Sequence, residues 1–143
     1  MGVTFFSSTL PMSIIVCHLL QDFYAHQEHL PALREEARHV LNDPSPDMSK
    51  LPLLESFLTE SIRYHCFLST VIHRVPLQPF TFSDGYTVPK GEIVEFFQHR
   101  TMNDAAIYSQ PTKFDPERFL GSERLASDLS KDWPFWGNSK LNW

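Results

Sequence analysis

Residues 51–66 read LPLLESFLTESIRYHC, an unbroken helical pattern from which the rest of the chain can be interpreted. Apolar residues recur at helical spacing, and the stretch contains no glycine. Pro52 suits a first helical turn, where a missing backbone N–H costs nothing. Glu60 and Arg63 are three residues apart and therefore share one face of the helix. The stretch predicts a helix with an apolar face and an acid–base pair. The apolar positions are Leu51, Leu54, Phe57, Leu58 and Ile62.

Two further helices are predicted upstream of this stretch. The mostly apolar spacing after Pro11 predicts a buried helix that begins near that residue. The segment 32–41, ALREEARHVL, follows Pro31 and carries acidic residues early and basic residues late, which suits the helix dipole. Residues 42–50, NDPSPDMSK, form a linker rich in turn-forming residues.

Downstream the pattern changes to short strands. STVIHRV and PFTF read as strands, and SDG at 83–85 is a turn signal. YTV, PKG and EIVEFF then predict a second hairpin with PKG at its bend. A short helix or turn is expected in TMNDAAIYSQ, and PTKFDPERF is irregular and punctuated by proline.

Composition excludes several classes of partner and site. The 143 residues carry a formal net charge of −5, which disfavours nucleic acid and acidic membrane surfaces. The two cysteines form no disulfide framework, which favours a reducing compartment, and we expect a cytoplasmic chain. The apolar start lacks a basic signal-peptide region, and Pro11 weakens a membrane span, so no membrane anchor is expected. His26 and His29 have HxxH spacing but lack a third ligand nearby, so no metal site is predicted.

Three motifs in order resemble the C-terminal part of a cytochrome P450, the haem-thiolate monooxygenase family. They are Glu60 with Arg63, then His73-Arg74, then FDPERF at 114–119. The E-x-x-R pattern alone is weak, because Glu35 and Arg38 repeat it by chance. The ordered set is specific, and its wording is most similar to fungal members of the family, many of which serve secondary metabolism.

The resemblance implies a mainly α fold with a small antiparallel β part (α+β), lacking the N-terminal half and the cysteine loop of the family. It places one domain portion over 1–143. Within it we expect helices over 1–50, the E-x-x-R helix over 51–66, β-hairpins over 67–98, and the PERF loop with an incomplete haem-binding loop over 99–143.

Site residues follow from the same resemblance. Glu60, Arg63 and Arg118 correspond to a structural ion-pair triad, and carboxylate matches the guanidinium fork bidentately. His73, Arg74 and Lys140 correspond to cations facing haem propionates, although His73-Arg74 also reads as an ordinary exposed strand pair. Candidates for the substrate pocket, which also read as a core strand, are Phe67, Leu68, Thr70, Val71 and Ile72. The prolines usual in this region are missing here, which leaves the pocket shape open.

The position of the family's iron-ligand cysteine falls on Trp143, and an indole N–H cannot coordinate iron as a thiolate does. The family's acid–threonine pair falls near Pro11 and Met12. The resemblance implies haem b, a flavin reductase, a small apolar substrate, and full-length relatives in the endoplasmic reticulum membrane. For this chain we expect a truncated lineage member with no catalytic residues and no activity alone. The alternative is a non-catalytic interaction fragment or a degenerate gene product.

Overall fold

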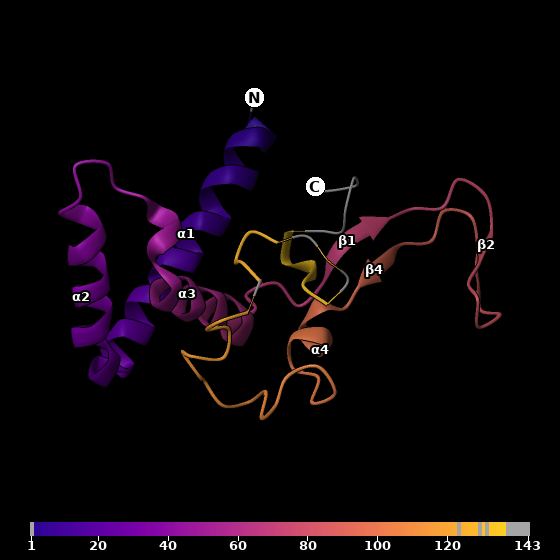
Figure 1. The fold of residues 1–143 in the computed structure, drawn as a ribbon. Helices are drawn as coiled ribbons and strands as arrows, with labels where there is room; N and C mark the ends of the chain where they lie inside the picture. The colour runs from indigo at the N-terminus through magenta and orange to yellow at the C-terminus, as the bar shows by residue number, and fades with distance from the viewer. Residues whose placement is uncertain (1, 123, 129, 131, 137–143) are drawn as a thin grey trace. The chain divides into compact units, whose positions relative to one another are not determined.

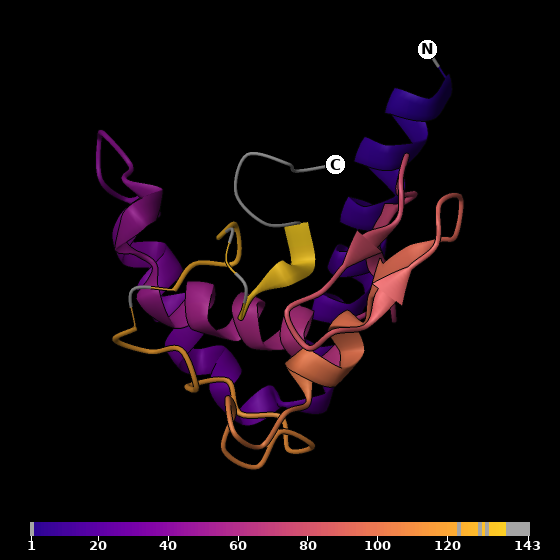
Figure 2. The ribbon, with the colours of Figure 1, turned by 90° about the vertical axis from the view of Figure 1, so that its right-hand side faces the viewer.

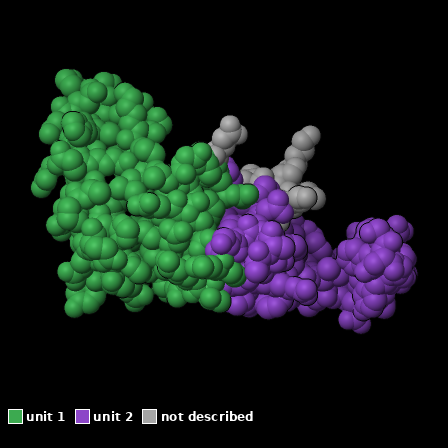
Figure 3. Space-filling view, turned by 60° about the horizontal axis from the view of Figure 1, so that its bottom comes forward, with its two compact units in different colours: residues 1–67, 110–127 green, residues 68–109, 128–143 purple. Residues whose placement is uncertain are grey.

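The computed structural model describes residues 2–122, 124–128, 130 and 132–136. The chain divides into two compact units, each built from two stretches of sequence (Figure 3). Unit 1 comprises residues 1–67 and 110–127, and unit 2 comprises residues 68–109 and 128–143. Unit 1 is helical and unit 2 contains the short antiparallel sheets, so the predicted mainly α class with a small β part is confirmed.

Unit 1 holds the three long helices (Figure 1). They are α1 (Gly2–Ala25), α2 (Leu30–Leu41) and α3 (Pro52–His65). Two 3₁₀ turns, η1 (Gln27–His29) and η2 (Met48–Lys50), precede α2 and α3. At η2 the Asp47 carboxylate accepts hydrogen bonds from the N–H and hydroxyl of Ser49, and the hydroxyl bond is the largest cause of the lowered pKa of Asp47.

Helix α1 was predicted to begin near Pro11 and to be buried, and both predictions were wrong. The helix begins at Gly2 and continues through Pro11. A proline removes one backbone donor, and the turn around it gains a bond from the Ser13 hydroxyl to the Thr9 carbonyl at 2.9 Å. Within the described side chains of α1, only Ile15 and Asp22 are buried. Apolar residues of α1 such as Met12, Val16 and Leu20 are instead exposed, so its apolar pattern does not correspond to burial.

Helix α3 forms over the predicted stretch. Pro52 occupies its first turn, and the helix ends where Cys66 adopts a left-handed backbone with φ 35°. A carboxylate from another helix caps its start, because Glu36 of α2 accepts the N–H groups of Leu53 and Leu54 at 2.8 and 2.9 Å. The first backbone N–H groups of a helix have no carbonyl acceptor within it. Glu36 therefore provides acceptors for two N–H groups of α3 that would otherwise lack them.

The apolar centre of unit 1 is an aromatic cluster on α3. Phe57 is 0% exposed and packs with Phe23 of α1 and Phe114 at ring-centroid distances of 4.8 and 5.4 Å. Phe114 in turn stacks on His26 at 4.4 Å. The cluster therefore joins α1, α3 and the irregular segment 110–127 through one contiguous set of rings.

Unit 2 is built on two short ladders. Strand β1 (Val71–Arg74) pairs with β4 (Val94–Phe96), and β2 (Phe80–Thr81) pairs with β3 (Thr87–Val88), both antiparallel. The turn at SDG forms as predicted: Gly85 has φ 91° and donates to the Phe82 carbonyl, while the Asp84 carboxylate accepts the Tyr86 N–H. Helix α4 (Gln98–Met102) and the 3₁₀ turn η3 (Pro134–Trp136) complete the unit.

The predicted second hairpin at PKG was wrong. Strand β3 does not turn back onto β4; instead β4 pairs with β1, and the β2–β3 hairpin is nested between them. Pro89 has no N–H to extend the β3 ladder, and the N–H of Gly91 bonds to the Pro76 carbonyl at 3.1 Å. The β1 strand is bulged at Ile72, which has φ 55°.

Helix α4 closes the base of the β1–β4 ladder. The buried Gln98 donates from Nε2 to the Leu68 carbonyl at 2.9 Å, and the His99 N–H donates to the Ser69 carbonyl at 3.2 Å. Met102 and Trp133 are fully buried in the same unit.

None of the helices in the described ranges combines the length and apolar character that a membrane span requires.

Replacing Phe57 with alanine should destabilise the protein by about 3–5 kcal/mol, because it empties the centre of the aromatic cluster. Tyr24→Ala is the control: Tyr24 is 80% exposed, and its loss should cost less than about 0.5 kcal/mol. Urea unfolding followed by circular dichroism measures both values. Equal losses for the two variants would contradict this packing.

Candidate functional site

A buried ion pair lies in the middle of α3. The Arg63 guanidinium donates from Nε and Nη2 to the two Glu60 carboxylate oxygens at 2.7 and 2.8 Å. Both side chains are 0% exposed. This two-point geometry fixes the orientation of both groups, and burial makes either charge costly if it loses its partner.

The segment 113–119 supplies a third charge to the same carboxylate. Arg118 donates from Nε to Glu60 Oε2 at 2.9 Å, and its side chain is 9% exposed. The backbone N–H of Asp115 donates to Glu60 Oε1 at 2.9 Å. Glu60 thus accepts hydrogen bonds from two guanidinium groups and one backbone amide, and it joins α3 to this segment.

A backbone carbonyl oxygen offsets part of the excess positive charge of the Glu60, Arg63 and Arg118 cluster. One carboxylate faces two guanidinium groups, so the three side chains carry a formal charge of +1. The Lys113 carbonyl accepts from Nη2 of both arginines, at 3.5 Å for Arg63 and 3.0 Å for Arg118. The carbonyl dipole offsets part of the excess charge. This arrangement is suited to holding a loop in one conformation rather than to moving a proton or electron.

A hydroxyl one turn earlier on α3 holds the same segment, and the sequence did not point to it. Ser56 is 1% exposed. Its Oγ donates to the Pro116 carbonyl at 2.7 Å and accepts the Phe119 N–H at 3.1 Å. Glu55 accepts the Ala126 N–H at 2.7 Å. The available signal was the set of polar residues on the helix that the sequence places beside its apolar positions, among them Ser56, Thr59, Glu60 and Arg63.

The chance E-x-x-R pattern on α2 behaves differently. Arg38 Nη1 lies 3.5 Å from Glu35 Oε2, and the two side chains are 69% and 64% exposed. An ion pair of this kind contributes little because water screens it. The same motif is therefore fully buried on α3 and largely exposed on α2, and of the two copies the α3 pair binds a distant segment.

The predicted propionate cations lie on β1 of unit 2. His73 and Arg74 are exposed, and Arg74 Nη1 donates to the His73 carbonyl at 2.8 Å. His73 Nε2 lies 3.5 Å from Glu95 Oε1. A carboxylate on the neighbouring strand therefore already accompanies the imidazole. Lys140 and Trp143 lie outside the described residues.

The five predicted pocket residues are divided between the two units, Phe67 in unit 1 and the other four in unit 2. Phe67 lines a small cavity of unit 1, whereas Ile72 lines a groove of unit 2. Val71 is buried at 3% exposure, the Leu68 carbonyl receives Gln98, and Thr70 Oγ1 lies 3.5 Å from His73 Nε2.

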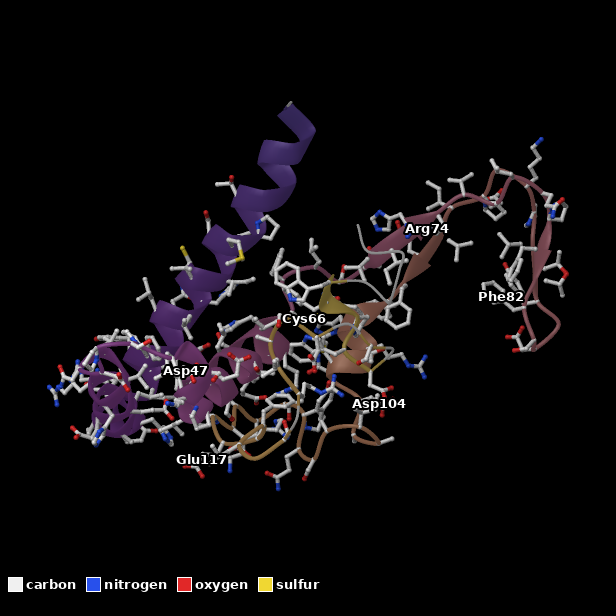
Figure 4. The ribbon with its side chains drawn as sticks, turned by 45° about the horizontal axis from the view of Figure 1, so that its top comes forward. Asp47, Cys66, Arg74, Phe82, Asp104 and Glu117 are labelled. Carbon is white, nitrogen blue, oxygen red and sulfur yellow. The ribbon has the colours of Figure 1, made fainter. Side chains whose placement is uncertain are left out.

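The groove of unit 2 has a volume of about 560 Å³ and a largely apolar lining. Its lining residues come from β1, β4, β2 and the stretch that follows β1, and two of them, Arg74 and Phe82, are labelled in Figure 4. Two charged side chains, Arg74 and Glu95, contribute to its lining. The apolar residues that line it are Ile72, Val75, Pro76, Leu77, Phe80, Phe82, Val94 and Phe96.

With this geometry established, comparison with known proteins identifies the family. The family model described as Cytochrome P450 matches residues 1–135.

The chain belongs to the cytochrome P450 family.

Fungal relatives of this P450 chain are monooxygenases by name. Dihydromonacolin L monooxygenase LovA of Aspergillus terreus is 35% identical over 115 residues, which cover 78% of this chain and 21% of the relative. Cytochrome P450 monooxygenase adrA of Penicillium rubens is 36% identical over 110 residues, which cover 75% of this chain and 21% of the relative. The chain thus spans about a fifth of the length of these two relatives.

A solved structure supports the fold of this P450 chain. A zebrafish cytochrome P450 matches with a TM-score of 0.80 and 21% sequence identity, covering 97% of this chain and 32% of that protein. At this identity the match establishes the fold alone. The partial P450 fold predicted from the sequence is therefore confirmed.

The P450 family implies haem b, held by a cysteine thiolate, and the cysteines of this chain do not fit that role. The sequence contains only Cys17 and Cys66. Cys17 is exposed on α1, and Cys66 is buried at the end of α3 (Figure 4). Neither follows η3, where the family resemblance puts the ligand. Among the described residues, no three His, Cys, Asp or Glu side chains are grouped to hold a metal ion.

Glu60→Gln should lower the free energy of unfolding by about 3–5 kcal/mol, because it leaves two buried guanidinium groups without a counter-charge. Glu35→Gln makes the same chemical change in the solvated E-x-x-R pattern and should cost less than about 0.5 kcal/mol. Urea unfolding at pH 7 measures both. Similar losses for the two variants would show that the α3 cluster is no stronger than a surface ion pair.

Proposed function

We propose that this chain is a member of the fungal secondary-metabolism P450 lineage that retains the structural centre of the fold and does not catalyse monooxygenation by itself. The observation that supports the first part is the buried cluster of Glu60, Arg63 and Arg118. The second part is supported by the donor set, because Cys17 and Cys66 are the only thiols and neither is placed as an axial ligand.

Haem, when bound in this family, supplies oxygen activation at a thiolate-ligated iron. The residues of this chain that we assign to its surroundings are the cations His73 and Arg74, whose place on β1 keeps them exposed. The Glu95 carboxylate beside His73 opposes the approach of an anionic group. A flavin reductase and a small apolar substrate are the partners that a complete enzyme of this lineage would use.

The second candidate is a non-catalytic interaction fragment. It is favoured by an apolar stripe on α1, defined here as Met12, Val16, Leu20 and Tyr24, which recur every four residues. Their side chains are 49–80% exposed. An unbroken apolar row of this kind marks an interface or an aggregation surface.

Carbon monoxide spectroscopy tests the proposed lack of haem-thiolate chemistry. The purified chain is mixed with haemin, reduced with dithionite and exposed to carbon monoxide. We expect no thiolate-type Soret band, because no cysteine is available at the proximal position. A thiolate-type band would refute the proposal, and its loss in Cys17→Ala or Cys66→Ala would identify the ligand.

Sedimentation velocity tests the second candidate. The unmodified chain should self-associate with rising concentration, because the stripe on α1 is apolar and exposed. Val16→Glu combined with Leu20→Glu should shift it toward monomer by placing like charges on the stripe. Gln21→Glu, which adds a charge beside the stripe, is the control. A wild-type chain that stays monomeric at all concentrations would rule out self-association through α1.

A further inference from the structure

The loop between α2 and α3 carries a serine that is followed by a proline. The loop reads NDPSPD at 42–47, and Ser45-Pro46 is the only Ser-Pro or Thr-Pro pair among the 143 residues. It lies between Leu41, where α2 ends, and Met48, where η2 begins. Figure 2 shows it as the purple loop at the upper left. A hydroxyl in a surface loop of this kind can be reached and modified by another enzyme.

The whole of this loop is accessible on the folded chain. All six residues, 42–47, are exposed. Pro44 and Pro46 have no backbone N–H, and each of them disfavours a helical conformation in the residue before it. The loop therefore continues neither of the neighbouring helices, and Ser45 is presented to solvent between two prolines.

The hydrogen bonds that the structure shows for the loop join it to itself and to its immediate neighbours. The Ser45 N–H donates to Asp43 Oδ1 at 2.9 Å, and the Asp43 N–H donates to the Val40 carbonyl at 3.2 Å. Asp47 accepts the N–H and the hydroxyl of Ser49. An enzyme that modifies a side chain binds the surrounding chain in an extended form, so the loop has to straighten. Exposed local bonds of this kind cost little to break, because water replaces them.

The residues around Ser45 distinguish between the classes of enzyme that phosphorylate serine. Asn42 and Asp43 occupy the third and second positions before it, so a kinase that requires arginine or lysine there finds no basic group. Pro46 offers no N–H, so a kinase that hydrogen-bonds the backbone of the next residue is also excluded. A kinase that packs the proline ring into an apolar pocket fits both features.

We propose that Ser45 is a phosphorylation site for a proline-directed serine/threonine kinase. In the transfer, the bond from the γ-phosphorus of ATP to its bridging oxygen breaks while a bond to Ser45 Oγ forms. The hydroxyl proton passes to the catalytic aspartate of the kinase, and ADP leaves. The phosphate adds a charge of about −2 beside the carboxylates of Asp43 and Asp47, which makes the loop strongly anionic. The proposal is independent of haem binding and of self-association through α1.

The test incubates the purified full chain with a proline-directed kinase and magnesium ATP, and mass spectrometry then locates the modified residue. We expect one phosphoryl group, on Ser45. Ser45→Ala should lose it entirely, and Pro46→Ala, which keeps the hydroxyl, should lose most of it. Ser83→Ala is the matched control and should be labelled like the wild type. Ser83 is also exposed in a turn, but Asp84 follows it in place of proline.

Circular dichroism before and after the reaction should show the same helical signal, because the hydrogen bonds described for the loop are local. An unlabelled wild-type chain, with a kinase that labels a Ser-Pro peptide in the same buffer, would overturn the proposal. Equal labelling of the wild type and Pro46→Ala would also overturn it, since exposure alone would then direct the kinase.

Discussion

The carboxylate of Glu60 is the acceptor on which unit 1 depends. It receives the guanidinium groups of Arg63 and Arg118 and the backbone N–H of Asp115. Segment 113–119 has no helix or strand of its own, so part of its backbone bonds to side chains of other elements. A buried carboxylate with several donors meets that need at one point, and it also fixes where the segment crosses α3.

The remaining polar contacts of unit 1 repeat this pattern around α3. Glu36 of α2 caps its first turn, Ser56 holds both sides of the PERF turn, and Asp22 of α1 binds its last turn. Phe57 supplies the apolar contact with Phe23 of α1 and with Phe114. Helix α3 is therefore bonded separately to α1, to α2 and to segment 110–127, which explains why so many of its polar side chains are buried. The buried polar side chains of α3 therefore position other segments of the chain.

The sequence predicted the features that follow from local periodicity and from ordered motifs. Helix α3, the SDG turn and the family could be read in this way, because each depends on neighbouring residues or on a fixed order. Hydrogen-bonding partners that lie far apart in the sequence could not be predicted. Nothing local distinguishes Glu36 as a cap for α3 or Asp22 as the acceptor of Ser61 and His65. The hairpin predicted at PKG was wrong for a similar reason. Whether β4 pairs with β3 or with β1 is decided by hydrogen bonds between residues far apart in sequence, and the turn residues do not determine it.

Hydrogen exchange of single backbone amides tests most directly whether α3 holds segment 113–119. If it does, the N–H groups of Asp115 and Phe119, which donate to Glu60 and Ser56, should exchange only when the whole protein unfolds. The Glu117 amide, whose hydrogen bond to the Asp115 carboxylate is exposed to solvent, should exchange much faster. Equal and fast exchange at all three positions would contradict the account, because the segment would then be free of the helix.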